Sequence, residues 1–233
     1  MTGRGVLDPP GVSLEPGLSD LCLLGLVRAE PIVAGPAGAG LDEAMDGLAA
    51  RLAVEHAGRE PSEISGLAPA RRLYRAFGVD PTRTRPSSEA LLRRVLQGKA
   101  LPRVINAVDV CNFCSLSFLL PIGLYDLEKV RGTIVLRRGL PEEAYQGIRK
   151  DSVGVAGRLV LADEEGAFGN PSSDSLRTCV DEGTRCLFMV IFAPAGHERD
   201  LMRSQVEAAM DAMILHLGPP GTVRAMGVVH PTP

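Results

Sequence analysis

Residues 82–126 read TRTRPSSEALLRRVLQGKALPRVINAVDVCNFCSLSFLLPIGLYD, and the rest of the chain is organised around this stretch. Pro86 disfavours helical geometry at Arg85, so a helix is expected to begin after it, capped by Ser87 or Ser88. The apolar spacing predicts this helix over residues 89–97, with Gly98 ending it. The residues predicted to face inward are Leu91, Leu92, Val95 and Leu96, and those predicted to face outward are Arg93 and Arg94.

Two clusters of polar residues stand beside apolar runs. The first interrupts the run over 108–116, at Asp109, Cys111, Asn112 and Ser115. The second follows later in the chain, at Asp174, Ser175, Arg177 and Thr178. Polar atoms in such places are either hydrogen-bonded within the fold or directed at a ligand. Because an amino-acid ligand needs an acceptor for its ammonium group and donors for its carbonyl, both clusters are candidate parts of one pocket.

The same polar groups can instead tie a loop to a sheet. Asp109 and Asp126 in particular are interpreted as capping or turn residues. No nucleophile–base pair is visible, because the histidines lie outside both clusters, at His56, His197, His216 and His230. His56 is expected at the surface near a helix end. No HExxH pattern occurs, and no metal or cofactor is expected.

The cysteines are odd in number and scattered, at Cys22, Cys111, Cys114, Cys179 and Cys186. That pattern favours reduced thiols over a disulfide framework. Cys111 and Cys114 have CxxC spacing, but a redox or zinc role needs a second pair or a helix N-terminus beside them. The cysteines are therefore interpreted as small buried residues.

Bulk composition is that of a globular protein, with 45% hydrophobic and 23% charged residues over a length of 233. No apolar run approaches the roughly 20 residues that a membrane helix needs. The N-terminus also lacks the basic and then apolar pattern of a signal peptide. We therefore expect a cytoplasmic protein with no membrane partner.

The charge is unevenly distributed along the chain. The formal net charge is −3, but residues 71–99 hold eight basic and two acidic residues, which leaves an excess of negative charge elsewhere. A basic face on an acidic body suits a limited phosphate contact, such as one arm of an RNA. The candidate RNA-binding residues are Arg85, Arg93, Arg94 and Lys99. The alternative interpretation is a helix face whose charges are simply solvated.

Periodicity predicts the remaining elements. Strands are predicted over 21–27, 132–137, 158–162 and 186–192, with a hairpin return through Ala167 and Phe168. Helices are predicted over 43–56 with Asp42 as its cap, over 70–77 and over 198–217. Because helices and strands mingle without a βαβ rhythm, the pattern favours an α+β layered fold. Residues 1–40 are expected to be irregular with one short strand, and residues 41–233 to form one domain.

The run Asn106-Ala-Val-Asp109-Val-Cys-Asn112-Phe, followed by Pro121-Ile-Gly-Leu-Tyr-Asp126-Leu-Glu-Lys-Val, resembles the B3/B4 module of the bacterial phenylalanyl-tRNA synthetase beta subunit. That module binds tRNA and hydrolyses mischarged tyrosyl-tRNA. With Arg85-Pro-Ser-Ser-Glu-Ala-Leu-Leu-Arg-Arg before it and Asp174-Ser-Leu-Arg177-Thr178 after it, the chain is more similar still to free-standing proteins of that family. The resemblance covers about residues 67–192 and implies a β-sandwich-like core flanked by helices.

The sequence departs from the synthetase module at the editing pocket. Gly123 stands where the module's Pro-x-His-Ala-Phe-Asp segment has histidine, and Val190 falls where the module has a glutamate. The module's threonine–asparagine pair matches Cys111 and Asn112, so only Asn112 carries over unchanged. The resemblance therefore implies Asn112 as the catalytic candidate, orienting a water with help from the terminal ribose hydroxyl of the tRNA.

Two functions of different classes remain open. The first is an editing-type deacylase that hydrolyses mischarged aminoacyl-tRNA in trans. The second is a non-catalytic module that binds a tRNA end, an amino acid or a related small ligand. Losing the histidine and the glutamate makes the pocket less polar, so tyrosine is not assumed as the discriminated side chain. A complete synthetase is excluded, because nothing in the chain resembles an ATP-binding catalytic core.

Overall fold

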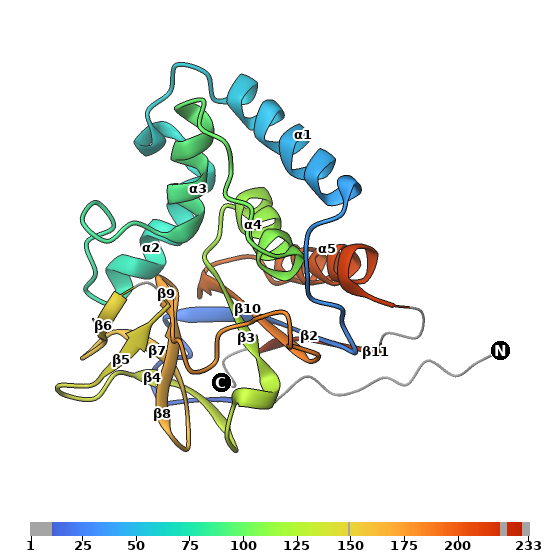
Figure 1. Ribbon diagram of the computed structural model, residues 1–233. Helices are drawn as coiled ribbons and strands as arrows, with labels where there is room; N and C mark the ends of the chain where they lie inside the picture. The colour runs from blue at the N-terminus through green and yellow to red at the C-terminus, as the bar shows by residue number, and fades with distance from the viewer. Residues whose placement is uncertain (1–10, 149, 220–222, 230–233) are drawn as a thin grey trace.

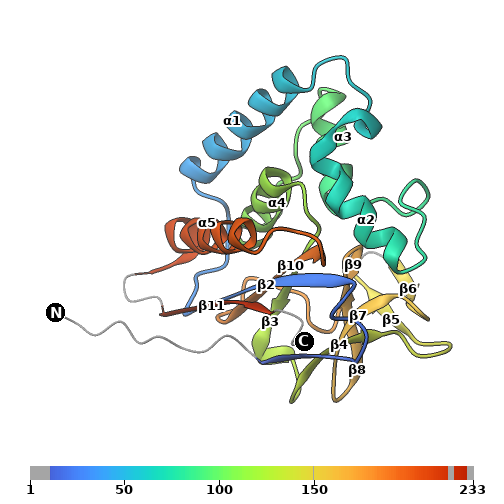
Figure 2. The same cartoon turned by 180° about the vertical axis from the view of Figure 1, so that it is seen from behind.

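The chain folds into stacked layers, which the computed structural model shows from two opposite sides in Figures 1 and 2. The structure describes residues 11–148, 150–219 and 223–229. Helices cover one face of a four-stranded sheet, and a five-stranded sheet packs against the other face. This is the expected α+β fold, with two sheets face to face and helices outside them.

The helices of the described residues are α1 (Ala39–Glu55), α2 (Ala68–Ala76), α3 (Ser87–Leu96), α4 (Asn106–Phe118) and α5 (Arg199–Leu217). The strands are β1 (Val12–Leu14), β2 (Cys22–Glu30), β3 (Ile122–Asp126), β4 (Ile134–Arg138), β5 (Ala144–Gly147), β6 (Lys150–Gly154), β7 (Leu159–Asp163), β8 (Gly166–Asn170), β9 (Ser173–Asp174), β10 (Leu187–Pro194) and β11 (Val223–Val229).

The two sheets differ in topology. The four-stranded sheet has the order β11-β2-β10-β3 and is antiparallel throughout. The five-stranded sheet has the order β1-β4-β7-β8-β9, in which β1 runs parallel to β4 and the other pairs are antiparallel. β5 and β6 form a separate hairpin. Strand β3 is therefore an edge strand, and its free edge contributes to the site described below.

The strand β10 lies at the centre of the fold, and all eight of its residues are buried. Phe188, Val190 and Phe192 point between the two sheets, whereas the alternate residues pack beneath the helices. Burial of each such side chain contributes about 1.5–3 kcal/mol. On the helical face of the neighbouring strand β2, a Cβ at Gly25 would overlap side chains of α5, so this glycine lets α5 lie directly against β2.

Two predicted helix caps are wrong. Helix α3 begins at Ser87, with Pro86 at its N-cap, so Ser87 and Ser88 lie inside the first turn. Their hydroxyls make no hydrogen bond within the described part of the chain. Helix α1 begins at Ala39, which places Asp42 in its first turn, where Arg103 donates to the Asp42 carboxylate at 2.8 Å. In both helices the chain enters helical geometry earlier than the polar residue that was expected to start it.

His56 is not a surface residue, as was expected, but is only 6% exposed. It follows Leu48 and Leu52 at a spacing of four, so it continues the buried face of α1 towards α3. Its Nδ1 atom has no hydrogen-bond partner among the described residues. His56 lies outside both polar clusters, as the sequence indicates.

Several strands have no counterpart in the expectation. β1 lies in the segment expected to be irregular, and β5 and β6 lie between residues 137 and 158, where no strand was predicted. β11 follows the last helix in a region for which no element was predicted. β1, β5 and β6 have at most five residues each, so their apolar periodicity is weak. Residues 1–10 and His230 lie outside the described part of the chain.

The remaining predicted strands and helices are confirmed within a few residues. Four of the five cysteines are buried and all five are free, as interpreted, and Cys179 is half-buried. Burial raises the pKa of Cys22 and of Cys114 to about 12, so these thiols are unreactive. No helix of the described residues has the length and apolar character to span a bilayer.

Candidate functional site

Helix α4 carries the first polar cluster, and two of its candidates secure the ends of the helix. Asp109 is buried, and its carboxylate accepts a hydrogen bond from the Val104 N–H at 3.0 Å. Ser115 donates its hydroxyl to the Leu120 carbonyl at 2.8 Å. Asp109 is therefore not the N-cap, which is Ile105, but it holds the turn before the helix, and Ser115 holds the turn after it.

Asp126 is likewise a turn residue, as interpreted. Its carboxylate accepts hydrogen bonds from the Glu128 N–H at 3.1 Å and from the Thr184 hydroxyl at 2.8 Å. Lys129 lies 3.3 Å from the same carboxylate. The side chain therefore anchors the end of β3 to the loop before β10.

Three of the four candidates in the second cluster are held by their own neighbours. Ser175 and Thr178 pair through their hydroxyls at 3.0 Å. The Arg177 guanidinium forms two hydrogen bonds to Asp163, at 2.9 and 2.8 Å, and lies over the Phe168 ring. Arg177 is thus held by its ion pair with Asp163, and we do not include it in the candidate site.

Asp174 is the exception, because its carboxyl group is enclosed and poorly satisfied. One oxygen accepts a long hydrogen bond, 3.4 Å, from the Leu124 N–H on the free edge of β3. The other has no hydrogen-bond partner in the described part of the chain. Burial raises the pKa of Asp174 to about 7, although the Tyr125 hydroxyl and the Leu124 N–H act to lower it. This carboxyl group therefore titrates near neutral pH.

Cys111 of α4 lies close to this carboxyl group. Burial raises the pKa of the Cys111 thiol, and the negative charge of Asp174 raises it further. The structure therefore brings together one member of each predicted cluster, through contacts of α4 and β9 with the strand β3 that lies between them. Asn112, the next residue on α4, is half-buried, and its amide makes no hydrogen bond within the described residues.

Tyr125 is a site residue that the sequence analysis missed. Its side chain is fully buried, with its ring edge-on to Phe168 at 5.0 Å between centroids. The hydroxyl is close enough to Asp174 to lower the pKa of that carboxyl group, but not in hydrogen-bond geometry. The synthetase segment that the sequence resembles has phenylalanine at this position. The additional hydroxyl of Tyr125 could therefore have indicated a site residue.

The Tyr125 hydroxyl fills the space in front of two glycines. A Cβ built at Gly123 or at Gly169 would overlap this hydroxyl. Gly123 is also the direct cross-strand partner of Val190, so the two positions matched to the module's histidine and glutamate are neighbours. We call Cys111, Gly123, Tyr125 and Asp174 the β3-edge site. It combines a carboxyl group whose pKa is raised with a fully buried phenol.

The predicted RNA-binding residues are not equivalent. Arg93 is half-buried, and its Nε donates to the buried Glu89 carboxylate at 3.2 Å, which Arg71 also holds at 2.8 and 2.9 Å. Arg94 donates to the Ala100 carbonyl at 2.9 Å. The two remaining candidates are Arg85 and Lys99. Both are exposed and have no ion pair among the described residues. They are therefore the candidates whose charge is free for a phosphate.

Comparison with protein-family models gives a match to the B3/4 domain over residues 69–216. The chain belongs to the B3/4 domain family. The match begins within α2, includes α3, α4 and the strands from β3 to β10, and ends within α5. All residues of the β3-edge site therefore lie inside the B3/4 domain.

Among solved structures, the B3/4 protein is similar to an N-terminal fragment of the phenylalanyl-tRNA synthetase beta subunit from Pyrococcus horikoshii. The identity is 12% and the TM-score is 0.44, over 94% of this chain and 52% of the fragment. The B3/4 protein thus spans about half the length of that fragment. A comparison with curated protein sequences gives no match.

Proposed function

We propose that this protein hydrolyses the ester bond of a mischarged aminoacyl-tRNA in trans. Membership of the B3/4 family and the resemblance of residues 67–192 to the synthetase editing module support this proposal. The observation that carries it is Asp174, whose buried carboxyl group has one oxygen without a partner among the described residues and a pKa raised to about 7. A carboxylate with such a pKa is a general base matched to neutral pH.

The step follows from ordinary ester chemistry. Asp174 accepts a proton from a water molecule while the water oxygen bonds to the ester carbonyl carbon. The bond from that carbon to the terminal ribose oxygen then breaks, and the ribose oxygen takes up the proton that Asp174 had accepted, which returns Asp174 to the carboxylate. The products are the free amino acid and the uncharged tRNA, so no oxidant or further reactant is needed.

Asn112 retains the catalytic role proposed from the sequence. Its amide is free of hydrogen bonds within the described residues, so its N–H groups are available to the carbonyl oxygen or to the water. One well-aimed donor of this kind contributes about a hundredfold or more in rate. Cys111 contributes apolar volume and not nucleophilicity, because its raised pKa keeps it as the thiol.

An Asn112→Ala protein is expected to lose at least about 99% of deacylation activity while it binds tRNA as the parent does, because the phosphate contacts lie elsewhere. The measurement is release of labelled amino acid from a panel of charged tRNAs, together with a tRNA-binding titration. Ser117→Ala, at an exposed position on the same helix, is the matched control and should remain active. Equal activity of Asn112→Ala and Ser117→Ala would remove the chemistry from this motif.

The tRNA is proposed to contact the basic face through Arg85 and Lys99. Replacing both with glutamine is expected to weaken tRNA binding about equally for different tRNAs and to lower the slope of log affinity against log salt by about 1.5. Arg199→Gln with Arg203→Gln, on α5, is the control of equal charge change. If both pairs leave affinity and salt slope unchanged, Arg85 and Lys99 are solvated charges only.

A specific feature favours the second candidate function, a non-catalytic module that binds an amino acid or a tRNA end. The Tyr125 hydroxyl already occupies the space in front of Gly169 and of Gly123, and Gly123 is the position at which the resembled module has its histidine. A site closed in this way admits only a small aminoacyl group or none. If the parent protein binds tRNA but hydrolyses none of the charged tRNAs in the panel, the non-catalytic module replaces hydrolysis as the function.

A further inference from the structure

Two enclosed polar atoms of the β3-edge site have no hydrogen-bond partner among the described residues. They are the Tyr125 hydroxyl and one carboxylate oxygen of Asp174. Enclosed polar atoms are nearly always satisfied, either by protein groups or by ordered water. The other enclosed side-chain atoms without a partner in the described part of the chain belong to His56, Ser87 and Ser88, which are not in this site. Two such atoms in one site therefore point to a group that both of them bind.

Strand pairing places these two atoms side by side. Asp174 of β9 is the direct cross-strand partner of Gly169 of β8. Directly paired residues project from the same face of a sheet, with their Cβ atoms about 4.5–5.5 Å apart. Gly169 has no Cβ, and the Tyr125 hydroxyl lies 2.3 Å from the place where one would stand. The hydroxyl thus takes the position of the side chain that would neighbour Asp174.

Cys111 and Tyr145 are the ionisable neighbours of this pair in the described part of the chain. Burial, and then the charge of Asp174, raise the pKa of both, so both keep their protons at neutral pH. Arg158 acts to lower the pKa of Tyr145, but it does not act on Asp174. Burial raises the pKa of Asp174, and the Tyr125 hydroxyl opposes that rise. Hydrogen-bond donors, and not a cation, are therefore what stabilise the ionised Asp174.

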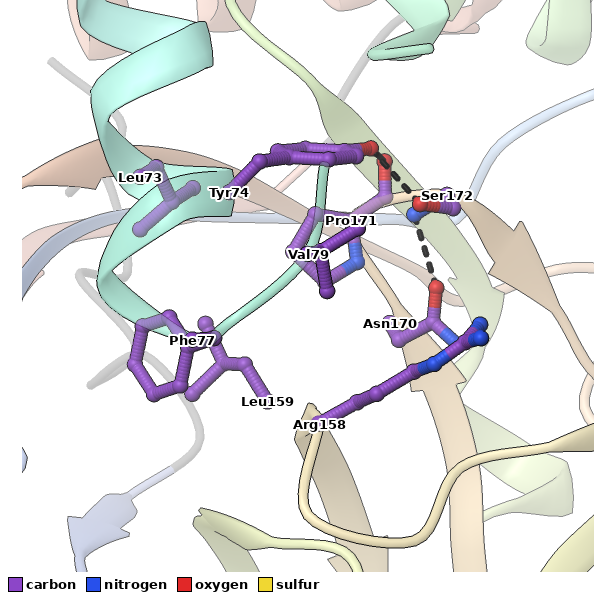
Figure 3. Close-up of a pocket in the computed structure, with 9 residues that line it drawn as sticks. All are labelled: Leu73, Tyr74, Phe77, Val79, Arg158, Leu159, Asn170, Pro171 and Ser172. Atoms are coloured by element: carbon purple, nitrogen blue, oxygen red, sulfur yellow. Dashed lines mark hydrogen bonds between the residues drawn. The ribbon is translucent and has the colours of Figure 1, made fainter. Parts of the chain in front are cut away.

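The turn that leads into Asp174 is held firmly by its own contacts. The Tyr74 hydroxyl donates to the Pro171 carbonyl at 2.8 Å and lies 2.7 Å from the Ser172 hydroxyl (Figure 3). The Asn170 side chain accepts from the Ser172 N–H at 2.7 Å. The cavity beside this turn measures only about 20 Å³, room for about one water molecule. It is therefore no ligand pocket, and the turn fixes the position of Asp174 in advance of any reaction.

We infer that the Tyr125 hydroxyl and the unpartnered Asp174 oxygen hold one water molecule between them, and that this is the water that attacks the ester. A bridging water satisfies both atoms at once. Asp174 as a residue is half-buried, so the site is not sealed from solvent although the oxygen itself is enclosed. The inference rests on the proposed hydrolysis and adds to it the place of the water and a role for Tyr125.

Tyr125 is suited to hold this water but not to deprotonate it. Burial raises the pKa of Tyr125 well above its ordinary value, so the hydroxyl keeps its proton and donates it in a hydrogen bond. The water accepts that bond and donates one of its own hydrogens to Asp174. When the water oxygen bonds to the ester carbonyl carbon, this hydrogen passes to Asp174 as a proton, and the Tyr125 proton stays in place. Tyr125 is thus a positioning residue.

The first test does not depend on turnover. NMR titration of the Asp174 carboxyl carbon, in the full chain, compares the parent with Tyr125→Phe. Loss of the donor is expected to raise the pKa of Asp174 by about one unit. Tyr145→Phe is the matched control, because the Tyr145 hydroxyl donates to the Ser173 carbonyl and accepts from Asn170. This control should leave the pKa of Asp174 within about 0.3 unit of the parent value.

The second test is a crystal structure of the parent at a resolution that shows ordered water. A water is expected within about 2.6–3.2 Å of both the Tyr125 hydroxyl and the Asp174 oxygen. A direct hydrogen bond between the two groups, with no water on them, would overturn the inference. So would a pKa of Asp174 that is the same in Tyr125→Phe as in the parent.

The third test assigns the water to the reaction. Tyr125→Phe is expected to lower kcat for deacylation by at least about tenfold with little change in KM, and to move the midpoint of the pH–rate profile up by about one unit. A merely structural role of the hydroxyl would not move that midpoint. A parent-like profile in Tyr125→Phe refutes the attack by this water. If the parent hydrolyses no charged tRNA, the proposed hydrolysis and the attack both fail, while the first two tests still decide whether the pair holds a water.

Discussion

An Asp174→Asn protein is expected to be more stable than the parent at about pH 8, by about 2 kcal/mol, and equally stable near about pH 4. The native pKa of Asp174 is about 7, raised by burial from an ordinary value of 3.8. A carboxyl group with a raised native pKa stabilises the fold while it is protonated. That stability is complete below about pH 4 and is lost as the pH rises through about 7.

The size of the gain follows from the same shift. Keeping Asp174 ionised in the fold costs up to about 4 kcal/mol above about pH 7, since one pKa unit is about 1.4 kcal/mol. Asparagine avoids this cost, and its amide N–H can reach the Tyr125 hydroxyl, but burial of the amide offsets part of the gain. Urea unfolding of both proteins across this pH range measures the difference.

Asp163→Asn provides the control of opposite sign. Burial raises the pKa of Asp163, but Arg177 and two backbone N–H groups outweigh it and hold that pKa below its ordinary value. Asp163→Asn should therefore destabilise the protein above about pH 4, with the loss vanishing at lower pH. An Asp174→Asn protein that is less stable than the parent at about pH 8 would contradict the raised pKa of Asp174.

A Gly123→Ala protein is expected to be destabilised by about 1–3 kcal/mol, because the new Cβ overlaps the Tyr125 hydroxyl and the ring cannot swing away. The ring is fully buried against Phe168 and Phe188. Tyr125→Phe removes the nearest overlapping atom, so the double variant should lose at least about 1 kcal/mol less than the sum of the single effects. Denaturant unfolding of the four proteins gives this coupling.

Gly25→Ala is the matched control for that cycle. Its Cβ would overlap Met202 and Val206 of α5, on the other face of the four-stranded sheet from Tyr125. Gly25→Ala and Tyr125→Phe should therefore add within about 0.5 kcal/mol. Additivity of Gly123→Ala with Tyr125→Phe would show that the hydroxyl does not fill the space in front of Gly123.

The fold was largely predictable because its main elements have strong apolar periodicity. The strand β10 is apolar on both faces, and α5 repeats apolar residues at three and four, so both were recognised within a residue or two. The predicted N-caps were wrong because a serine or aspartate is an N-cap only if its own backbone and the chain before it are not yet helical. At Ala39 the helix has already begun three residues before Asp42.

The site was predictable only in part, for a physical reason. The sequence singled out both clusters, but which of their polar groups has a hydrogen-bond partner depends on contacts between distant segments. Ser175 and Arg177 have partners nearby, whereas Asp174 meets the edge of β3 and keeps one oxygen without a partner in the part of the chain that the structure describes. Tyr125 was missed because it lies within an apolar strand. The apolar spacing therefore predicts a core residue at this position and not a site residue.

The most direct test of the central claim is the pH dependence of deacylation by the parent and by Asp174→Asn, corrected for spontaneous hydrolysis. The account predicts that the parent rate rises with pH to a plateau above about 7, as Asp174 loses its proton, and that Asp174→Asn shows no turnover at any pH. An Asp174→Asn protein that deacylates the same charged tRNA at the parent rate across this range would contradict it.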